Sequence, residues 1–266
     1  MSPLRSALIG STGFVGSNLM AQERFDEKFH RSDIDVIRGR DYGLIVCAGA
    51  PGGKWIANRE SKADGRTLRS LMAALDNVHA EEFVLVSTID VYAHPTSVTE
   101  GSEVVASGPY GSHRFELEDF VSRRFPNHRI IRLPGLFGPG LRKNVIFDLL
   151  NGNQVGQVDP SAVLQWYDVG LLWRDIGILR QSDVRLLNLA TEPVENRVIS
   201  TRFFPDVAVG TPSRAAPKYD VRTLHSRLFG KSGAYCYTQD ETLACLGSFV
   251  AAVREGSVLC GFPYRT

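Results

Sequence analysis

Ala7-Leu8-Ile9-Gly10-Ser11-Thr12-Gly13-Phe14-Val15-Gly16 is the stretch from which the organisation of this chain can be worked out. Its first three apolar residues predict a short strand, and the apolar positions from Phe14 onward predict a helix. The three glycines divide three tasks: a tight turn, close approach of the backbone to a pyrophosphate, and close packing of helix on strand. A helix N-terminus facing that turn offers free N–H groups and partial positive charge. The alternative interpretation of these glycines is an ordinary glycine-rich turn, but their position directly after the first strand favours a dinucleotide site.

Length and composition limit the class of protein. The chain has 266 residues, of which 43% are apolar, which suits one large α/β domain or a domain with a small lobe. The formal net charge is +1 and the charges are interspersed, so neither nucleic acid nor a membrane is predicted as a partner. No apolar run approaches bilayer length, and the N-terminus runs directly into the first strand without room for a signal peptide. We therefore expect a soluble, cytoplasmic protein.

The four cysteines lie far apart in the sequence, at Cys47, Cys236, Cys245 and Cys260. None forms a Cys-x-x-Cys pair, which argues against a zinc cluster and against a disulfide framework. Cys47 stands in an apolar run and is predicted to be a small buried hydrophobe. No metal site is predicted.

The segment 27–32 is a plausible second strand that ends in Arg31 and Ser32. In a dinucleotide fold the end of this strand faces the adenosine ribose, where an Arg accommodates a 2′-phosphate and an acidic residue binds a 2′-hydroxyl. Arg31 and Ser32 favour NADP, whereas the adjacent Asp33 could serve the ribose of NAD. The cofactor prediction is NAD(P), with a slight lean to NADP.

Too few residues separate the second and third strands for the usual plan. Residues 33–42 leave room for one short turn of helix before the strand 43–48, so the sheet is predicted to lack one strand of the doubly wound arrangement. The loop 49–53 follows at the carboxyl end of a buried strand, where open α/β sheets bind ligands.

Three residues in the segment after that loop, Lys54, Trp55 and Asn58, could face the crevice. The alternative is that Trp55 packs and Lys54 is solvated.

Further along, hydrophobic periodicity places the remaining elements. Leu68, Leu71, Met72 and Leu75 form one apolar helix face, and the apolar run 83–88 is typical of a strand buried on both faces. A helix is predicted at 107–125, capped by Ser107, with Phe115, Leu117, Phe120 and Val121 buried. The other expected elements are a strand at 128–133, helices at 145–150, 171–179 and 240–253, and a late strand at 186–190. The segment 193–218 is not placed.

Together these elements predict an α/β fold: a Rossmann-like, doubly wound parallel sheet with a small C-terminal substrate lobe. The predicted dinucleotide-binding domain spans residues 1–165, with a late strand at about 185–191. Residues 140–160 and 192–266 are assigned to the substrate-binding lobe.

A phenol, a hydroxyl and a fixed cation are expected near the loop that would hold the dinucleotide. Tyr110 and Arg114 are four residues apart on a predicted helix and so share one face. Thr88 ends a central strand, from which its hydroxyl can reach the facing helix. This combination suits proton transfer beside a hydride carrier.

Five motifs in order carry a family resemblance: GSTGFVG at 10–16, VSTIDVY at 86–92, YGSHR at 110–114, RLPGLFGPG at 132–140 and NLA at 188–190. The chain resembles, over roughly residues 5–190, the extended short-chain dehydrogenases/reductases, the NAD-dependent epimerase/dehydratase family. Members are NAD(P)-dependent epimerases, dehydratases and reductases that act mostly on nucleotide-sugars.

The resemblance implies catalytic roles for Thr88, Tyr110 and Arg114. Tyr110 would be the acid/base and Thr88 would hydrogen-bond the reacting oxygen, while the pKa of the phenol must fall well below its usual value of about 10. The motifs and the loops described above together give the candidate cofactor-binding residues Gly10, Thr12, Gly13, Phe14, Val15, Gly16, Arg31, Ser32, Ala48, Gly49, Ala50, Ser87, Tyr110, Arg114 and Pro134.

Two features depart from the family pattern. Arg114 stands where the family normally has Lys; it can bond the nicotinamide ribose and stabilise a tyrosinate, but it cannot pass a proton onward. The alternative is that Arg114 is a helix-surface residue in a site that has lost activity. The chain is also short for the family. The candidate substrate contacts, each of which could equally be structural, are Asp90, Asn144, Gln165, Tyr167 and Arg222.

The leading hypothesis is an NAD(P)-dependent oxidoreductase or epimerase acting on a nucleotide-sugar. The alternatives are a non-catalytic NAD(P)-binding regulatory protein and a reductase of a small carbonyl compound. A homodimer is an expectation from the resemblance.

Overall fold

Six parallel strands form the central sheet of the chain, in the order β2-β1-β3-β4-β6-β10. The structure, a computed structural model, describes residues 4–106 and 108–260. The strands are β1 (Ser6–Ile9), β2 (Glu27–Phe29), β3 (Asp41–Cys47), β4 (His79–Thr88), β6 (His128–Leu133) and β10 (Leu186–Asn188). The predicted parallel α/β sheet is confirmed.

The first half of the sheet is short by one strand. The doubly wound plan places three strands in that half, whereas among the described residues only β1 and β2 lie beyond β3. The 3₁₀ helix η1 (Ile34–Ile37) is the whole connection between β2 and β3 apart from turns. The prediction of a missing strand, drawn from the length of 33–42, is confirmed.

The second strand ends earlier than predicted. β2 stops at Phe29, and the expected continuation through Arg31 and Ser32 is wrong. A tight turn replaces it, because the backbone N–H of His30 donates to Oδ1 of Asp33 at 2.7 Å and the N–H of Asp33 donates to the His30 carbonyl at 3.2 Å.

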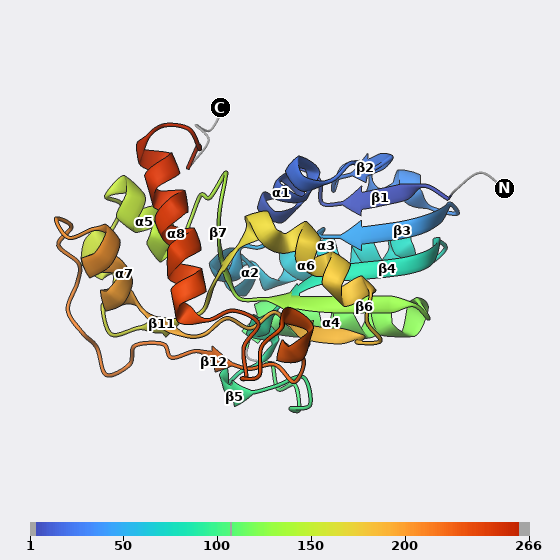
Figure 1. Cartoon of the computed structure of the whole chain (residues 1–266). Coiled ribbons are helices and arrows are strands. Elements are labelled where there is room, and N and C mark those ends of the chain that lie inside the picture. Colours follow the sequence, from blue (N-terminus) through green and yellow to red (C-terminus); the bar gives the residue numbers. More distant parts are fainter. Residues whose placement is uncertain (1–3, 107, 261–266) are drawn as a thin grey trace.

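Helices cover both faces of the sheet (Figure 1). On one face lie α3 (Ser61–Leu75) and α4 (Gly108–Arg124), and on the other α1 (Phe14–Gln22) and α6 (Leu172–Arg180). Successive strand residues alternate between the two cores: Ile45 and Cys47 join the α3/α4 side, and Val46 joins the α1/α6 side. This double burial explains the continuous apolar runs of the strands.

Most side chains predicted for the core are buried. Leu68, Leu71 and Leu75 of α3 face the sheet, and Cys47 is fully buried. Phe115 is an exception: 38% of it is exposed, so its predicted burial is wrong. Ser107, the predicted cap of α4, lies outside the described residues.

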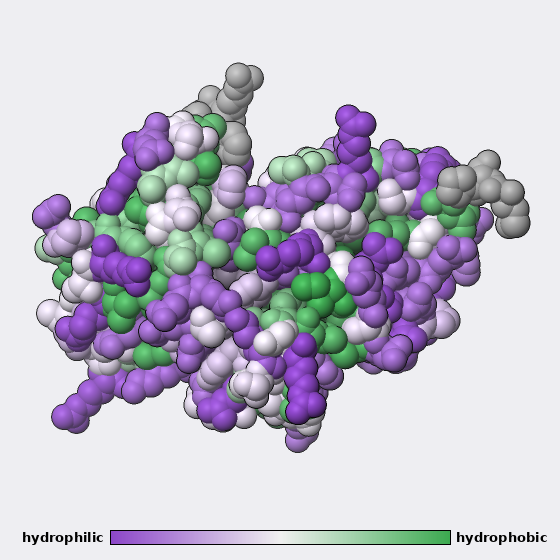
Figure 2. Space-filling model, in the orientation of Figure 1, coloured by the Kyte–Doolittle hydropathy of each residue, from purple (hydrophilic) through white to green (hydrophobic). Residues whose placement is uncertain are grey.

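A separate apolar cluster builds the C-terminal lobe, at the left of Figure 1. It joins α5 (Val145–Asn151), α7 (Asn196–Phe203) and α8 (Gln239–Arg254) around side chains such as Phe249. Helix α7 occupies part of the segment that the sequence left unplaced. Figure 2 shows a largely hydrophilic face, with apolar residues gathered over α8.

Short elements connect the sheet to the lobe. Three two-stranded pairs are β5–β12, β7–β9 and β8–β11, and 3₁₀ turns punctuate the loops. Their bounds are α2 (Lys54–Arg59), η2 (Ile89–Val91), β5 (Thr96–Val98), β7 (Gly135–Phe137), η3 (Val155–Gln157), β8 (Val163–Leu164), β9 (Trp166–Asp168), η4 (Val169–Leu171), β11 (Val194–Glu195), β12 (Asp220–Val221) and η5 (Ser226–Phe229).

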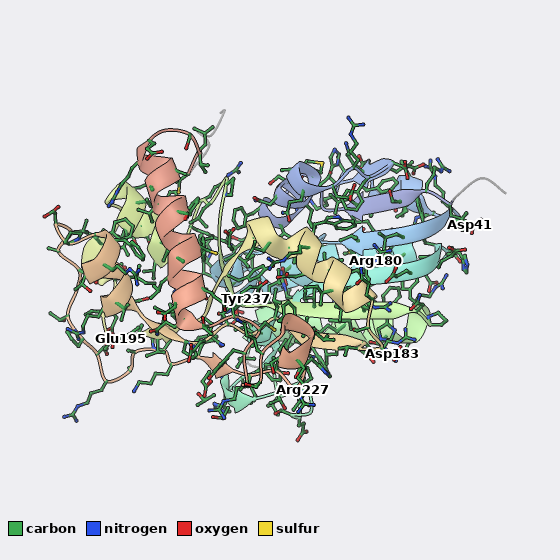
Figure 3. All side chains as sticks on the ribbon, in the orientation of Figure 1. Asp41, Arg180, Asp183, Glu195, Arg227 and Tyr237 are labelled. Carbon is green, nitrogen blue, oxygen red and sulfur yellow. The ribbon has the colours of Figure 1, made fainter. Side chains whose placement is uncertain are left out.

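A buried carboxylate fastens the chain leading into α8 to helix α6. Asp175 is fully buried and accepts hydrogen bonds from the hydroxyls of Tyr167 at 2.7 Å and Tyr237 at 2.5 Å. Arg174 adds a hydrogen bond from Nε at 2.9 Å. Tyr237, labelled in Figure 3, lies near the junction of the two parts.

All four cysteines are free thiols, and two of them, Cys47 and Cys236, are buried. Across residues 4–106 and 108–260, no helix has both the length and the apolar character needed to traverse a bilayer.

Helix α1 packs against the turn after β1 with no room for a side chain. A Cβ at Gly16 would lie 2.1 Å from the carbonyl oxygen of Gly10. We therefore expect Gly16→Ala to lower the free energy of unfolding by about 3 kcal/mol or more, because backbone must move to admit the methyl group.

The matched control is Gly177→Ala in α6, where no described atom outside the helix backbone lies within 4 Å of the added Cβ. This change should stabilise the protein by about 0.5–1 kcal/mol, since alanine favours helix. Urea unfolding measures both, and equal effects of the two substitutions would contradict the packing argument.

Candidate active site

The turn after β1 forms a cradle that only glycine backbone allows. Gly10 has φ +87°, and a Cβ there would lie 2.3 Å from the carbonyl oxygen of Ala48. Gly13 is the N-cap of α1 and provides no side-chain hydrogen bond to the helix, so the first helical N–H groups have no capping side chain. Such a terminus binds anions, and the cradle fits a pyrophosphate.

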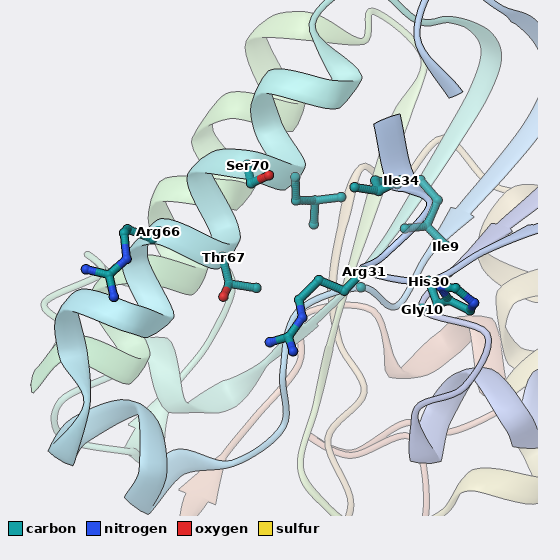
Figure 4. A pocket seen from close by; sticks show the side chains of 10 residues that line it. Ile9, Gly10, His30, Arg31, Ile34, Arg66, Thr67 and Ser70 are labelled. Atoms are coloured by element: carbon teal, nitrogen blue, oxygen red, sulfur yellow. The ribbon is translucent and has the colours of Figure 1, made fainter. Parts of the chain in front are cut away.

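Beside the cradle lies a pocket of about 330 Å³, lined by Gly10 and Gly49 at the sheet and by Thr67 on α3 (Figure 4). Two guanidinium groups also line it: Arg31 from the turn after β2 and Arg66 from α3. Both side chains are exposed. Neither donates to another group in the part of the chain that the structure describes, which leaves both available to an anion.

Asp33, the acidic residue that follows Arg31 and Ser32, already has partners within the fold. Oδ1 of Asp33 accepts from the backbone of His30, and Oδ2 lies 3.3 Å from Nδ1 of the same histidine. Ser32 also bonds that ring nitrogen, at 2.9 Å. Asp33 thus closes the turn after β2. Among the described residues it forms no ion pair with Arg31 or Arg66, the two cations that line the pocket.

Thr88 and Tyr110 lie together, as the sequence analysis expected. Thr88 is the last residue of β4, and Tyr110 stands in the first turn of α4. Their side chains lie close enough for the Thr88 hydroxyl to favour the ionised form of Tyr110, and Oγ1 of Thr88 accepts from the N–H of Asp90 at 3.1 Å. The N–H of Tyr110 donates to Oδ1 of Asn58 at 3.0 Å, so α2 holds the start of α4.

Arg114 is buried, with 2% of its side chain exposed, and so it is not a helix-surface residue. It forms a two-pronged ion pair with Asp64 of α3, Nη1 to Oδ2 at 2.5 Å and Nη2 to Oδ1 at 2.9 Å. Nη2 also donates to the carbonyl of Pro51 at 2.5 Å, which ties down the loop after β3. Its Nε is buried without a partner among the described residues.

The guanidinium of Arg114 also lies over the ring of Tyr110, with Cζ 4.0 Å from the ring centroid. Burial raises the pKa of Tyr110, and Asp90 adds to the increase. Arg114, the hydroxyl of Thr88 and the ammonium of Lys54 lower it but do not reverse the net rise. The expected fall in the pKa is therefore not produced by the side chains alone, because desolvation outweighs the cations.

Asp90 is the one substrate candidate that lies against the Thr88–Tyr110 pair. Its Oδ1 accepts from Nζ of Lys54 at 2.6 Å and from the hydroxyl of Tyr219 at 2.8 Å. Lys54 thus faces the site, as the sequence suggested, whereas Trp55 is 59% exposed with Arg59 over its ring.

The other four substrate candidates have partners within the fold. Asn144 caps α5 through Oδ1 and donates to the Leu136 carbonyl. Gln165 is 2% exposed and bonds only backbone groups, while the hydroxyl of Tyr167 is taken by Asp175. Arg222 pairs with its neighbour Asp220 at 2.7 Å. The structure does not bring these four to Tyr110.

The remaining candidate cofactor-binding residues differ in position and in exposure. Ala48, Gly49 and Ala50 follow β3, and Thr12 is exposed at the tip of the turn. Phe14 and Val15 pack partly into the cores, and Pro134 is buried after β6. Ser87 donates to Glu118 at 2.5 Å, and that carboxylate also pairs with Arg132, so Ser87 belongs to a buried network beneath the site.

Sequence reasoning missed Asp64 and Arg66, which both lie on α3. Asp64 had a detectable signal: it precedes Leu68 and Leu75 on the same apolar stripe, where a charged residue requires a partner. Arg66 is an exposed charge on a helix, and nothing in the sequence sets it apart.

Comparison with known proteins gives the fold. No model of a protein family and no curated protein matches the chain. Among solved structures, the UDP-glucose 4-epimerase of Thermotoga maritima, with UDP-glucose, matches with TM-score 0.73 and 15% identity over 95% of this chain and 99% of that one. The dTDP-4-dehydrorhamnose reductase of Bacillus anthracis, with NADP, matches with TM-score 0.73 and 17% identity over 94% and 99%.

A UDP-N-acetylglucosamine 4-epimerase from Methanobrevibacter ruminantium, with UDP-N-acetylmuramic acid, matches with TM-score 0.74 and 12% identity over 96% of this chain and 100% of that one. The chain therefore has the fold of the nucleotide-sugar epimerases and reductases. This confirms the fold implied by the resemblance to the extended short-chain dehydrogenases/reductases.

We expect Asp64→Asn to lower the free energy of unfolding by about 3–5 kcal/mol at pH 7, because it leaves Arg114 buried without a counter-charge. Burial raises the pKa of Asp64, but the hydrogen bonds from Arg114 and His113 outweigh burial and hold the pKa below its usual value. The stabilisation is therefore complete at neutral pH and is lost as the pH falls through the pKa of the folded state.

Urea unfolding from pH 7 down to pH 3 should show the difference between wild type and Asp64→Asn shrinking. Asp119→Asn is the control, since Asp119 pairs with Arg123 on the exposed side of α4, the helix that carries Arg114, and should change stability by less than about 0.5 kcal/mol. A difference that is constant with pH would contradict the role of the Asp64 carboxylate.

Proposed function

We propose that this protein is an NAD(P)-dependent oxidoreductase or epimerase that acts on a nucleotide-sugar. The observation that carries the proposal is the neighbouring pair of Thr88 and Tyr110 at the carboxyl end of β4, where α/β sheets bind ligands. The glycine cradle after β1 lies in the same sheet and is suited to a pyrophosphate. The shared fold with NAD- and NADP-bound nucleotide-sugar enzymes supports the same chemistry.

Each side chain has a distinct task in this proposal. Tyr110 exchanges a proton with the reacting oxygen of the substrate, and the Thr88 hydroxyl binds that oxygen. The nicotinamide, when bound, supplies the hydride chemistry. Arg114 holds the loop after β3 through Pro51 and offers its buried, unpartnered Nε to a ribose hydroxyl. It does not relay the proton, since a guanidinium stays charged.

The pocket beside the cradle favours NADP. A 2′-phosphate would lie between the guanidinium groups of Arg31 and Arg66, which is a strong, charge-assisted arrangement. Asp33, the residue suited to a 2′-hydroxyl, is bonded to His30 instead. The slight preference for NADP that Arg31 indicates is thus supported by a second cation, Arg66.

The lobe of α5, α7 and α8 would hold the sugar-nucleotide. It falls within residues 140–160 and 192–266, which we propose as the substrate-binding part, with residues 1–165 and the late strand as the dinucleotide-binding part. The Thermotoga and Methanobrevibacter structures contain UDP-sugars, which supports a nucleotide diphosphate as the handle of the substrate.

The purified protein, tested with NADPH or NADH and a panel of UDP- and dTDP-sugars including 4-keto forms, should turn over at least one substrate. Tyr110→Phe should lower kcat by about 10²–10⁴-fold, the usual contribution of a positioned acid/base. Tyr42→Phe is the control, because Tyr42 bonds Glu27 at the amino end of β3. Undiminished turnover in Tyr110→Phe would contradict the assignment.

Tight cofactor binding with no turnover of any substrate would favour the non-catalytic alternative. Turnover of a small carbonyl compound without any nucleotide-sugar activity would favour the third hypothesis.

Arg31→Ala and Arg66→Ala should each weaken NADPH binding by about tenfold and leave NADH binding within twofold, because only NADPH carries the extra phosphate. Titration calorimetry measures both cofactors. Arg69→Ala is the control on α3, since Arg69 does not line the pocket. An equal loss for NADPH and NADH would contradict the assignment of the phosphate site.

A further inference from the structure

Three segments that are distant in the sequence meet at the side chain of Asp90. Lys54 comes from the start of α2, Asp90 lies in η2 directly after β4, and Tyr219 lies in the segment that leads to β12. Nζ of Lys54 and the hydroxyl of Tyr219 both donate to Oδ1 of Asp90, at 2.6 and 2.8 Å. Nζ of Lys54 also lies 3.1 Å from the hydroxyl of Tyr219. We name these three residues the Asp90 cluster.

The Asp90 cluster is joined to the proposed acid/base by backbone contact. The N–H of Asp90 donates to Oγ1 of Thr88, whose side chain lies beside Tyr110. A Cβ at Gly111 would lie 2.4 Å from the carbonyl oxygen of Asp90, so α4 touches η2 one residue after Tyr110. Helix α2 contacts both Asp90 and Tyr110. Nζ of Lys54 donates to Asp90, and Oδ1 of Asn58 accepts from the backbone N–H of Tyr110.

Charged groups face Tyr110 from several elements and oppose one another. Arg114 on the same helix favours the phenolate, but its charge is shared with Asp64 of α3, which also bonds His113. Asp90 from η2 disfavours the phenolate, and Lys54 from α2 favours it. Lys143, whose charge interacts with that of Arg114, donates to the carbonyl of Gly52.

Lys54 is well suited to balance Asp90. Burial would lower the pKa of its ammonium, but Asp90 and Tyr219 raise that pKa to about 12, so the group stays charged. About half of the side chain is exposed. A permanent cation is thus bonded to the carboxylate that opposes ionisation of Tyr110.

We propose that Lys54 is a positioning residue: its ammonium fixes the Asp90 carboxylate and cancels its charge, which allows Tyr110 to ionise beside it. The inference rests on the proposed function, in which Tyr110 is the acid/base. Both donors of the cluster take Oδ1, and Oδ2 accepts from no group in residues 4–106 or 108–260. Oδ2 is therefore presented to a substrate hydroxyl in a fixed direction.

The test is the titration of Tyr110 in the full-length protein. Tyrosine labelled with ¹³C at Cζ reports ionisation by NMR, and the signal that Tyr110→Phe removes is that of Tyr110. Lys54→Met should move this titration to higher pH, because it removes a cation and leaves Asp90 uncompensated. Lys54→Arg should restore the wild-type titration. Asp90→Asn should move it to lower pH.

Turnover gives a second reading. Lys54→Met should lower kcat at pH 7 by about tenfold and shift the pH profile to higher pH, and Lys54→Arg should recover most of the activity. Lys54→Met should also raise KM, since Asp90 loses its fixed direction. Unchanged NADPH affinity and an unchanged urea midpoint establish that the variant is folded.

A Tyr110 titration in Lys54→Met at the wild-type pH, or a Lys54→Arg variant that behaves like Lys54→Met, would overturn the inference. Full turnover in Tyr110→Phe would overturn the proposed function instead. The two failures are distinguishable, because the NMR titration detects the coupling of Lys54, Asp90 and Tyr110 without any reaction.

Discussion

The buried ion pair between Arg114 and Asp64 is the interaction on which the proposed site depends. It fastens α4 to α3, and through Pro51 it fastens the loop after β3, so the helix that carries Tyr110 is fixed relative to the cofactor side of the sheet. Arginine suits this task, because its planar fork can hold a carboxylate with two N–H groups and still reach a carbonyl. Lysine offers one nitrogen and could not span both partners.

That arrangement also changes the electrostatics around the phenol. A guanidinium paired with Asp64 compensates only part of the desolvation of Tyr110, whose pKa is raised by burial. In the proposed site a second cation, Lys54, therefore acts on Tyr110 by pairing with Asp90. The hydroxyl of Tyr219, from the segment before β12, donates to the same carboxylate. In this account the charge balance is spread over α2, α3 and α4 rather than placed in one residue.

Local patterns made most of the sheet predictable, whereas long-range pairings were not. The strand and turn of residues 7–16 follow from apolar runs and glycine spacing, and the missing strand follows from the ten residues between 33 and 42. The predicted end of β2 was wrong because two hydrogen bonds between His30 and Asp33 close a turn there. Asp64 and Arg114 are 50 residues apart, so only the unusual charge on an apolar stripe hinted at their pairing. Gln165 looked like a possible substrate contact, since residue type does not reveal whether backbone groups already satisfy its amide.

The central claim is that one dinucleotide spans the glycine cradle and the Thr88–Tyr110 pair. A crystal structure of the protein grown with NADP tests it most directly. The account predicts the pyrophosphate at the N-terminus of α1, the 2′-phosphate between Arg31 and Arg66, and the nicotinamide ring beside Tyr110. A nicotinamide ring far from Tyr110 and Thr88, or a dinucleotide bound away from the turn at Gly10, would contradict it.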